Sequence, residues 1–583
     1  MNRSVRCAIC AFLVIVGATI RCAGSGPTAD RDDVREKARD LAPAAADGKI
    51  DLTEPGIVFD HDDTVILEEL EAILLLPPEE SGDAMPETSG VVENRVSAPP
   101  EAIKGLERYL GKEVSLGILN QLMRAIVLGY RDAGLPVVDV FFPEQDITDG
   151  VVRIYVVEGK LGEIRVEGAE RANQEDLMSQ VGLKTGEQIR SEPLEDDLRW
   201  LNGNYFRSVG LVYQAGEEIG ATDLILKVDE FDAFRVYSGI ANTGVELTGE
   251  NEWSAGLLWG DVLGSETMLT YGISRDLDFE SLISQSGYAR TPLPWRHYVE
   301  FFAAHLETNA QFPLTTGTFL DVGGSTTQAG FGYVIPLSPI IENRVTHSLT
   351  FGADYTSTNN DLSFGGATVI NETAAILQGR AEYEASVTGD SSRSDFMLGA
   401  VFSPGNLIGN NDDSSFSALR SGADPEYFYL ITEIEHTRQL PWFGLEAAFD
   451  FVGQWSNDRL LSNEQLLIGG YTTVRGFGQS VLRGDHGIVA SAELNLPDFS
   501  VPMPIKFDKK ASLQPYLFCD YGWIDVADPT AGETSETLSS TGAGIRYTFG
   551  DHLSARAEYG WGIDYPDYII ETSKFHFSME VRF

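Results

Sequence analysis

The sequence of 583 residues lacks any apolar run that would cross a membrane as a helix, since no segment approaches the roughly 18 apolar residues that such a helix needs. Basic residues are scarce too. The 42 Lys and Arg against 88 Asp and Glu argue against nucleic acid as a partner. We interpret the acidity as solvation of loops rather than as a cation-binding site. If the chain spans a bilayer, a closed β-sheet is the only remaining route.

Cysteine and the common catalytic motifs are also nearly absent. Three of the four cysteines lie in the first 23 residues, so the rest of the chain keeps only Cys519 and has no disulfide framework. The sequence contains no nucleophile elbow, no His-Glu-x-x-His motif, no Cys and His cluster at metal spacing and no phosphate-binding glycine loop. We therefore expect a protein that is not an enzyme and that holds neither metal nor cofactor.

The amino-terminus has the order of a secretory signal peptide. Two arginines are followed by an apolar run too short for a membrane span, and then by small residues. We therefore predict a signal peptide at residues 1–23. Residues 24–52 are polar, and within them residues 31–46 fit either a helix or a disordered tether, two alternatives that the sequence leaves open.

Strict alternation marks residues 574–583 at the end of the chain. Every second side chain is apolar and the last residue is Phe583, as expected for a strand with one face toward lipid. An edge strand of a soluble β-sandwich is the alternative for this segment alone. From about residue 234 onward, about sixteen segments show similar patterns, and outer-membrane barrels require an even number of strands. We predict an antiparallel transmembrane β-barrel at residues 232–583.

Connections between these segments alternate between short and long, as in a barrel with tight periplasmic turns and large external loops. Short connections are predicted at residues 292–296, 439–442 and 550–552, and long ones at residues 307–326, 356–373, 404–425 and 457–487. The first and last strands have no other free partner, so we expect the barrel to close by pairing residues 235–240 with residues 575–581.

Two small α+β modules in series are predicted ahead of the barrel, at residues 53–160 and 161–231. Each shows helical spacing followed by two strands. The opening strand and helix of the first module have two candidates, which are residues 91–96 with 102–110, or residues 56–60 with 64–76 and a proline-rich insertion at residues 77–100.

Three groups of residues carry a resemblance to a known family. They are Pro143, Gln145, Asp149 and Gly150 in a turn of the first module, Val474, Arg475, Gly476 and Phe477 in a long loop of the barrel, and Phe518, Asp520 and Gly522 on a strand further on. Over residues 105–583 the chain resembles two-partner-secretion transporters, the haemolysin-activator-like branch of the Omp85 superfamily with POTRA modules. A lone Val-Arg-Gly-Phe is a weak signal, but the Phe-x-Asp-x-Gly motif that follows it makes the resemblance specific.

This resemblance implies an outer-membrane pore whose periplasmic POTRA modules dock an unfolded secreted polypeptide and pass it to the cell surface without nucleotide hydrolysis. The client in such systems is a large adhesin or haemolysin that folds as a β-helix. A lumen-plugging helix of the family would correspond to residues 31–46, and Phe583 would be read by the barrel-insertion machinery. An assembly factor that inserts β-barrels is the alternative function, and a passive porin is a third. We expect the transporter to work as a monomer in outer-membrane lipid.

Two contacts follow from the predicted strands. Asp520 is expected to point into the barrel, because a carboxylate that faces lipid is costly at mid-depth. Glycines beside Arg475 let the external loop fold back into the lumen. We therefore predict a bidentate Arg475–Asp520 ion pair in a wet lumen, and we expect exchange of the two charges to recover more function than either single change. In the second module, residues 209–215 or 222–228 are expected to offer a free sheet edge to a client strand.

Overall fold

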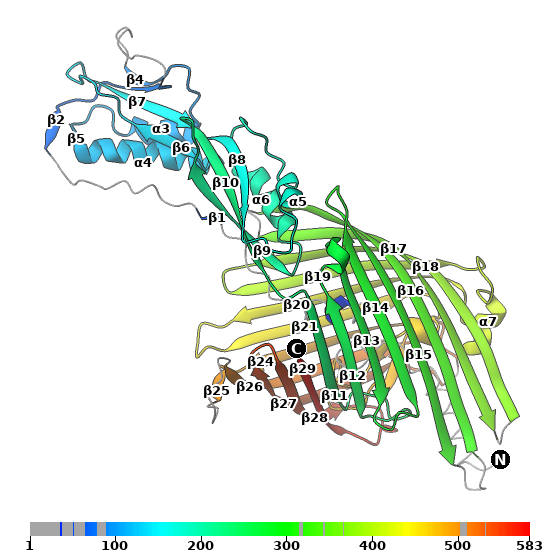
Figure 1. Cartoon of the computed structure of the whole chain (residues 1–583). Coiled ribbons are helices and arrows are strands. Elements are labelled where there is room, and N and C mark those ends of the chain that lie inside the picture. The colour runs from blue at the N-terminus through cyan, green and yellow to red at the C-terminus, as the bar shows by residue number, and fades with distance from the viewer. Residues whose placement is uncertain are drawn as a thin grey trace. The chain divides into compact units, whose positions relative to one another are not determined.

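The computed structural model describes residues 35–37, 50–51, 64–78, 89–313, 319–341, 344–364, 367–501, 510–530 and 532–583 (Figure 1). The chain forms two compact units, Pro43–Asp232 and the combination of Met1–Ala42 with Ala233–Phe583. The predicted signal peptide lies outside the described residues. Of the predicted helix or tether, residues 35–37 are described, and they are helical. In the described part of the chain, no helix is both long and apolar enough to cross a membrane.

Sixteen antiparallel strands of the described chain close into a barrel, which confirms the predicted fold (Figure 1). They are β11 (Phe234–Ala241), β12 (Glu252–Trp259), β13 (Met268–Asp276), β14 (Leu282–Pro292), β15 (Tyr298–Pro313), β16 (Phe319–Ile340), β17 (Val345–Phe364), β18 (Ala367–Thr388), β19 (Ser392–Pro404), β20 (Glu426–Gln439), β21 (Glu446–Ser456), β24 (His486–Asn495) with β25 (Phe499–Val501), β26 (Ala511–Asp525), β27 (Glu536–Phe549), β28 (Leu553–Asp564) and β29 (Ser573–Arg582). Because β24 and β25 pair with different parts of β26, they count as one interrupted strand.

The barrel closes between its first and last strands, as predicted. β11 pairs antiparallel with β29, and Tyr237 lies opposite Arg582. Phe583 continues this pairing, because its N–H donates to the Val236 carbonyl at 2.9 Å and its carbonyl accepts from the Val236 N–H at 3.0 Å. The end of the chain is therefore part of the seam that closes the barrel.

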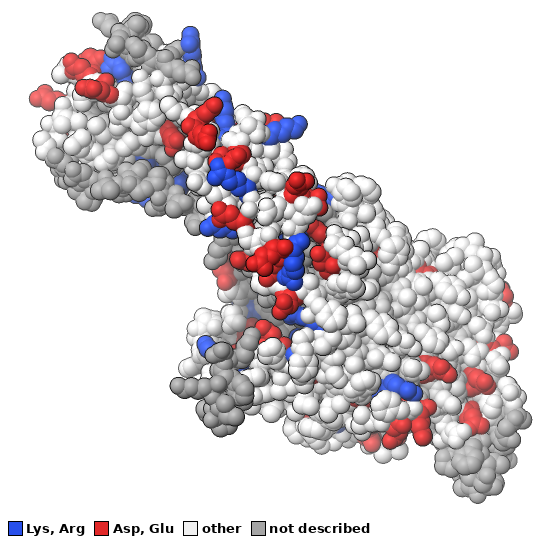
Figure 2. Space-filling model, viewed as in Figure 1, with Lys and Arg blue, Asp and Glu red and all other residues white. Residues whose placement is uncertain are grey.

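Side chains on each strand alternate between the lumen and the outer surface. On β26, Leu517 and Tyr521 are 52% and 41% exposed, whereas Phe518 and Asp520 are 3% and 1% exposed. On the face shown in Figure 2, the middle of the barrel wall is largely uncharged, and acidic side chains gather toward its ends. Such a belt of apolar outward side chains suits the hydrocarbon layer of a bilayer.

Two of the predicted long loops are strands instead. The prediction of loops at residues 307–326 and 356–373 is wrong, because β15 to β18 run through most of both segments and pair as hairpins. Beyond the bilayer, both faces of a strand meet water, so its side chains are polar on both faces. The apolar alternation that identifies a strand in the sequence is then lost. The long connections predicted at residues 404–425 and 457–487 are confirmed, and α7 (Asp413–Leu419) lies in the first of them.

The first module has a sheet in the order β4–β3–β7–β6 that is covered by two helices. Its elements are β2 (Val65–Leu67), β3 (Ala72–Leu76), β4 (Gly90–Glu93), α3 (Pro100–Glu107), β5 (Val114–Ser115), α4 (Leu116–Asp132), β6 (Val138–Phe141) and β7 (Val151–Glu158). The amphipathic face of α4 packs into the core, where Leu122, Ile126 and Tyr130 are completely buried.

The candidate at residues 91–96 and 102–110 matches the structure, because β4 overlaps its strand and α3 overlaps its helix. The other candidate is wrong at residues 64–76, which hold the strands β2 and β3 rather than a helix, and its strand at residues 56–60 lies outside the described residues. All five residues of β3 are apolar and buried, and it pairs in parallel with both β4 and β7. A strand buried on both faces is a continuous apolar run, which periodicity alone does not distinguish from a helix. β4 is an edge strand of this sheet, and β3, which neither candidate gives as a strand, lies between β4 and β7.

The second module has a sheet in the order β1–β9–β10–β8. Its elements are β1 (Ile50–Asp51), β8 (Lys160–Glu167), α5 (Gln174–Ser179), α6 (Ser191–Leu201), β9 (Arg207–Ala215) and β10 (Ala221–Glu230). The prediction of a free edge at residues 222–228 is wrong, because β10 lies between β8 and β9. The helices carry the chain across the sheet, and the β9–β10 hairpin then folds back onto β8. The other predicted edge, β9, pairs with β1 at Leu211 and Val212.

Candidate functional site

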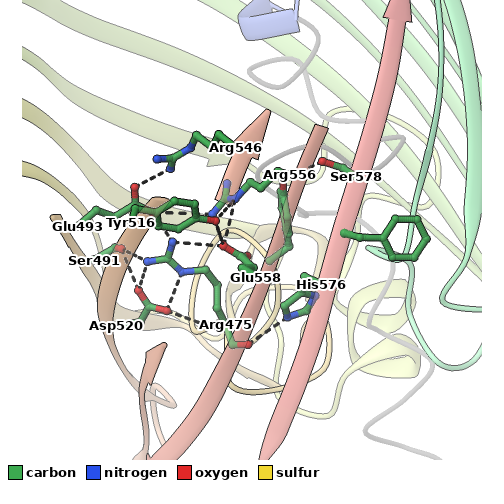
Figure 3. Close-up of polar contacts among 12 residues, drawn as sticks. Arg475, Ser491, Glu493, Tyr516, Asp520, Arg546, Arg556, Glu558, His576 and Ser578 are labelled. Atoms are coloured by element: carbon green, nitrogen blue, oxygen red, sulfur yellow. Dashed lines mark hydrogen bonds and ion pairs between the residues drawn. The ribbon is translucent and has the colours of Figure 1, made fainter. Parts of the chain in front are cut away.

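The loop between β21 and β24 folds back into the barrel and places its tip against the inner wall (Figure 3). A short hairpin, β22 (Leu466–Ile468) with β23 (Leu482–Gly484), leads to the tip, where Val474 is completely buried. Gly469 and Gly470 have φ angles of 101° and 108°, a backbone region that glycine occupies without strain. These glycines allow the inward turn that the sequence predicts.

Small residues let the loop tip approach the wall closely. A Cβ atom added to Gly476 would lie 2.7 Å from the side chain of Ser540 on β27. One added to Gly560 on β28 would lie 2.5 Å from the Arg475 carbonyl oxygen. Both distances are too short for a side chain. The loop tip therefore fits against the wall only because positions 476 and 560 are glycine. Gly522 faces the tip in the same way, with less crowding.

Arg475 and Asp520 form the predicted ion pair. The guanidinium donates from Nε to Oδ2 at 2.9 Å and from Nη2 to Oδ1 at 2.5 Å (Figure 3). The Arg475 backbone N–H also donates to Oδ2, at 3.0 Å. The contact is thus the bidentate fork that arginine makes with a carboxylate. The expectation of a wet lumen is wrong at this point, because the surrounding loop and wall leave Arg475 only 3% and Asp520 only 1% exposed.

Sequence analysis misses several partners of Arg475. Its Nη1 contacts the Glu493 carboxylate, and its Nη2 donates to Ser491 Oγ at 2.8 Å. The guanidinium carbon lies 3.7 Å from the centre of the Phe518 ring, so the predicted apolar shelf also makes a cation–π contact. Glu493 and Ser491 share the inward face of β24, and their position on that face is the signal that identifies them.

Two further arginines surround the ion pair. Arg546 donates to Glu493 at 2.6 Å, and Arg556 donates to Glu558 at 2.7 Å. The Glu558 carboxylate lies 3.7 Å from Nη1 of Arg475. With Asp520 included, three carboxylates face three guanidinium groups, so the formal charges of the cluster balance. The rings that close the cluster are those of Tyr471, Tyr516, Phe518 and His576.

A second buried carboxylate holds the base of the same loop. Asp485 is completely buried and accepts from the Leu460 N–H at 3.1 Å and from the Ala527 N–H at 2.9 Å. Arg420, from the connection that contains α7, makes a bidentate pair with the same carboxylate. Asp485 therefore joins three connections at one end of the barrel.

The helical residues 35–37 contact the lumen side of the barrel wall. Arg35 donates to both oxygens of Glu384, at 2.7 and 3.0 Å, and its Nε lies 3.8 Å from Glu300. Lys37 pairs with Glu580 on β29. These carboxylates lie on the inward faces of three different strands, so this short stretch is held to the wall by charge.

The predicted turn motif braces the connection between β6 and β7. Gln145 donates to the Arg153 carbonyl and accepts from the Arg153 N–H, both at 2.7 Å. Asp149 accepts from Arg153 at 2.8 Å, and this hydrogen bond holds the pKa of Asp149 below its usual value. Gly150 has a φ of 76°, and its carbonyl accepts the first amide of β3 at 3.2 Å. Pro143 opens the connection. Apart from Pro143, these motif residues make contacts within the module that stabilise its turn.

Replacing Gln145 with leucine removes both hydrogen bonds to the Arg153 backbone. We expect the connection to lose about 1–2 kcal/mol of local stability. Hydrogen exchange at the Arg153 amide of the full-length protein should then become roughly tenfold faster. Gln174→Leu, at an exposed position of α5, is the control and should leave that amide unchanged. An unchanged exchange rate in Gln145→Leu would show that other contacts hold the turn.

The last predicted site residue, Phe583, lies at the seam of the barrel. Its backbone extends β29 along Val236, and its side chain is 74% exposed. An aromatic side chain at the end of a barrel strand is typical of the membrane interface. Its role as an assembly signal stays a prediction.

Comparison with known proteins identifies the family. The sequence matches the family described as haemolysin secretion/activation protein ShlB/FhaC/HecB over residues 220–547, and a ShlB-type POTRA domain over residues 88–159. The chain belongs to this haemolysin secretion/activation family. The match includes Val474 to Phe477 and Phe518 to Gly522, so the family resemblance drawn from these motifs is confirmed.

The proteins similar to this chain are named as transporters, and CdiB is named as an outer-membrane transporter. The heme/hemopexin transporter protein HuxB of Haemophilus influenzae (strain 86-028NP) is 24% identical over 464 residues, which cover 76% of this chain and 77% of that protein. The outer membrane transporter CdiB of Escherichia coli O6:K15:H31 (strain 536 / UPEC) is 25% identical over 493 residues, which cover 77% of this chain and 74% of that protein. Among solved structures, CdiB from Escherichia coli has a TM-score of 0.67 at 18% identity and covers 97% of this chain and 100% of that chain, which shows the shared fold.

Membership of the haemolysin secretion/activation family therefore confirms the predicted location and the predicted general activity of the protein. The protein is an outer-membrane β-barrel with periplasmic POTRA modules, and it translocates a secreted partner protein. Its relatives are transporters rather than enzymes, which supports a non-enzymatic role.

Proposed function

We propose that the protein exports one unfolded polypeptide, which docks on the POTRA modules before it enters the barrel. The observation that carries this proposal is the buried contact between the loop tip and the wall, with Arg475 only 3% exposed. A loop packed into the lumen narrows the pore, which suits a secretion pore that must stay closed until its client arrives. Folding of the client outside the cell drives the movement, so no nucleotide is consumed.

The client that fits this architecture best is a large secreted protein of the adhesin or haemolysin type with a β-helical fold. Among the relatives, one is named for heme and hemopexin. We further propose that the transporter works as a monomer in outer-membrane lipid. Its export would remove a signal peptide at residues 1–23, and the charged contacts of Arg35 support a lumen plug within residues 24–52.

Co-expression with a candidate client tests the proposed function. The candidate is the product of a very long neighbouring reading frame with a β-helical repeat pattern. We expect it to reach the medium or the cell surface only when the transporter is present. If the client stays periplasmic, and other barrel proteins instead disappear from the outer membrane when the transporter is deleted, the assembly-factor alternative is correct.

The free edge of the first module supports docking by strand addition. β6 lies at the rim of its sheet. Because the Gly159 N–H donates to the Val137 carbonyl at 3.0 Å, the alternation of an antiparallel pair turns the Val140 N–H outward. Phe141 is 41% exposed and packs edge-on against Tyr155 at 5.5 Å, so an apolar side chain stands beside the open amide. An unfolded client gains backbone hydrogen bonds at such an edge without a sequence requirement.

Val140→Pro removes the outward donor of β6 and leaves its bonds to β7 in place, since proline is tolerated on an edge strand. We expect secretion of the client to fall about tenfold, the effect of losing roughly 1–1.5 kcal/mol of hydrogen bonding. Val140→Ala keeps the amide and loses similar packing, so it should secrete almost normally. Barrel levels in the outer membrane should be equal in both. Equal secretion by the two variants would exclude strand addition at β6.

A further inference from the structure

The groups that bind the Arg475 side chain all belong to the barrel wall. Asp520 and Phe518 lie on β26, Ser491 and Glu493 lie on β24, and Glu558 lies on β28. Each of these strands is held by backbone pairing along both of its sides. We call these five side chains the guanidinium cradle. Because no residue of the cradle belongs to the loop, we expect the cradle to keep its shape when the loop tip leaves.

The guanidinium cradle matches both the edge and the face of a planar guanidinium group, and Figure 3 shows the contacts along the edge. Along the edge, the Asp520 carboxylate accepts two N–H bonds, at 2.9 and 2.5 Å, and Ser491 Oγ accepts one at 2.8 Å. On the face, the Phe518 ring lies 3.7 Å from the guanidinium carbon. An ammonium group has neither the fork nor the flat face, so the cradle favours arginine over lysine.

Charge makes an empty cradle unfavourable. Without Arg475, the three carboxylates Asp520, Glu493 and Glu558 face only two cations, Arg546 and Arg556. Glu558 is 2% exposed, and its Oε1 has no hydrogen-bond partner among the residues that the structure describes. Withdrawal of the loop tip removes part of the burial of these carboxylates, but it leaves the wall with one negative charge in excess. A replacement cation would restore the charge balance of the wall.

We propose that the guanidinium cradle is a binding site for arginine side chains of the polypeptide in transit. An arginine of the client takes the place of Arg475 once the loop tip has left, and the exchange keeps the formal charges of the wall balanced. The ligand class is thus an extended peptide that presents arginine, and the site would act as a counter-ion along the export path. This proposal rests on the proposed function, because the client must pass through the lumen to reach the cradle.

Chemical complementation of purified Arg475→Ala tests the binding site directly. The probes are methylguanidinium chloride and the blocked tripeptide Gly-Arg-Gly, with methylammonium chloride and blocked Gly-Gln-Gly as matched controls. We expect the two guanidinium probes to raise the thermal unfolding midpoint of the full-length variant saturably at millimolar concentration. We expect Arg475→Ala to conduct more than the wild type in planar bilayers, and the guanidinium probes should remove at least half of that excess. The control compounds should do neither.

Two proteins control for unspecific effects of the probes. In the wild type the cradle is filled, and in Arg475→Ala/Asp520→Asn its principal acceptor has lost its charge, so neither should respond. An equal response in either protein, or no response of Arg475→Ala, would overturn the proposal. A response to methylguanidinium alone would also overturn it, because the site would then exclude a peptide. None of these measurements requires secretion, so failure of the proposed function and failure of the cradle are distinguishable.

Discussion

Replacing Arg475 with alanine is expected to leave the barrel folded in the outer membrane and to reduce secretion of the partner by roughly tenfold or more. Breaking a buried ion pair costs about 3–5 kcal/mol, because the remaining carboxylate is left without its cation. The ion pair holds the loop tip in one position on the wall. Its loss is therefore expected to disorder the loop tip and to leave the barrel folded. Secretion is measured against the amount of heat-modifiable barrel in outer-membrane fractions.

Arg475→Lys should restore only part of this activity. Lysine keeps the positive charge but loses the two parallel bonds to Asp520 and the flat contact with Phe518. Arg393→Ala is the matched control, because the Arg393 side chain is 63% exposed and pairs with Asp395 away from the loop. Full activity of Arg475→Lys would mean that charge alone, without the geometry of the fork, holds the loop.

Exchange of the charges of Arg475 and Asp520 is not expected to restore secretion. A two-residue pair would tolerate Arg475→Asp with Asp520→Arg, as the sequence alone suggests. In the structure, however, an aspartate at position 475 would face the carboxylates of Glu493 and Glu558. We therefore expect the double variant to secrete no better than Arg475→Asp. Clear rescue by the exchange would show that the surrounding carboxylates contribute little.

Deleting Phe583 is expected to lower the amount of protein in the outer membrane several-fold. Two causes combine, loss of the exposed aromatic side chain and loss of two backbone bonds to Val236 in the seam. Phe583→Ala separates them, because it keeps the backbone pairing and removes only the side chain. Quantitative immunoblots of membrane fractions are the measurement.

The assembly-signal role of Phe583 predicts that Phe583→Ala resembles the deletion. Phe577→Leu, an aromatic replacement within the same strand, is the control and should assemble almost normally. If Phe583→Ala assembles as well as Phe577→Leu, the side chain is one more aromatic at the lipid surface. The defect of the deletion would then come from the broken seam.

Strand segments that face lipid were predictable from the sequence, and strand segments with water on both faces were not. The alternation in residues 574–583 identifies β29 and its inward face, because a bilayer imposes one apolar side on every strand that crosses it. β17 extends through Thr356 to Phe364 with polar residues on both faces, so no pattern reveals it. The prediction for β3 was wrong for the opposite reason, because β3 is apolar on both faces and its sequence shows no alternation.

The loop motif shows how far local sequence reaches toward the site. The pairing of Arg475 with Asp520 is predictable because the two residues lie in the paired motifs of the family resemblance, and the inward parity of Asp520 and the glycines of the loop agree with it. Glu493 and Glu558 are inward by the same parity, but many other charged residues share that property. Their meeting at one guanidinium depends on the register between strands, which side-chain patterns do not specify.

By itself, the sequence determined the barrel, its sixteen strands, the closing pair, the presence of two modules and the two motifs that meet, because each leaves a local trace in periodicity or residue type. Only the tertiary structure decided the order of strands within the modules, the dry surroundings of Arg475 and the balance of three carboxylates against three guanidinium groups. Burial and charge balance are sums over neighbours that are distant in the chain. They arise only when the register of the closed sheet brings those neighbours together.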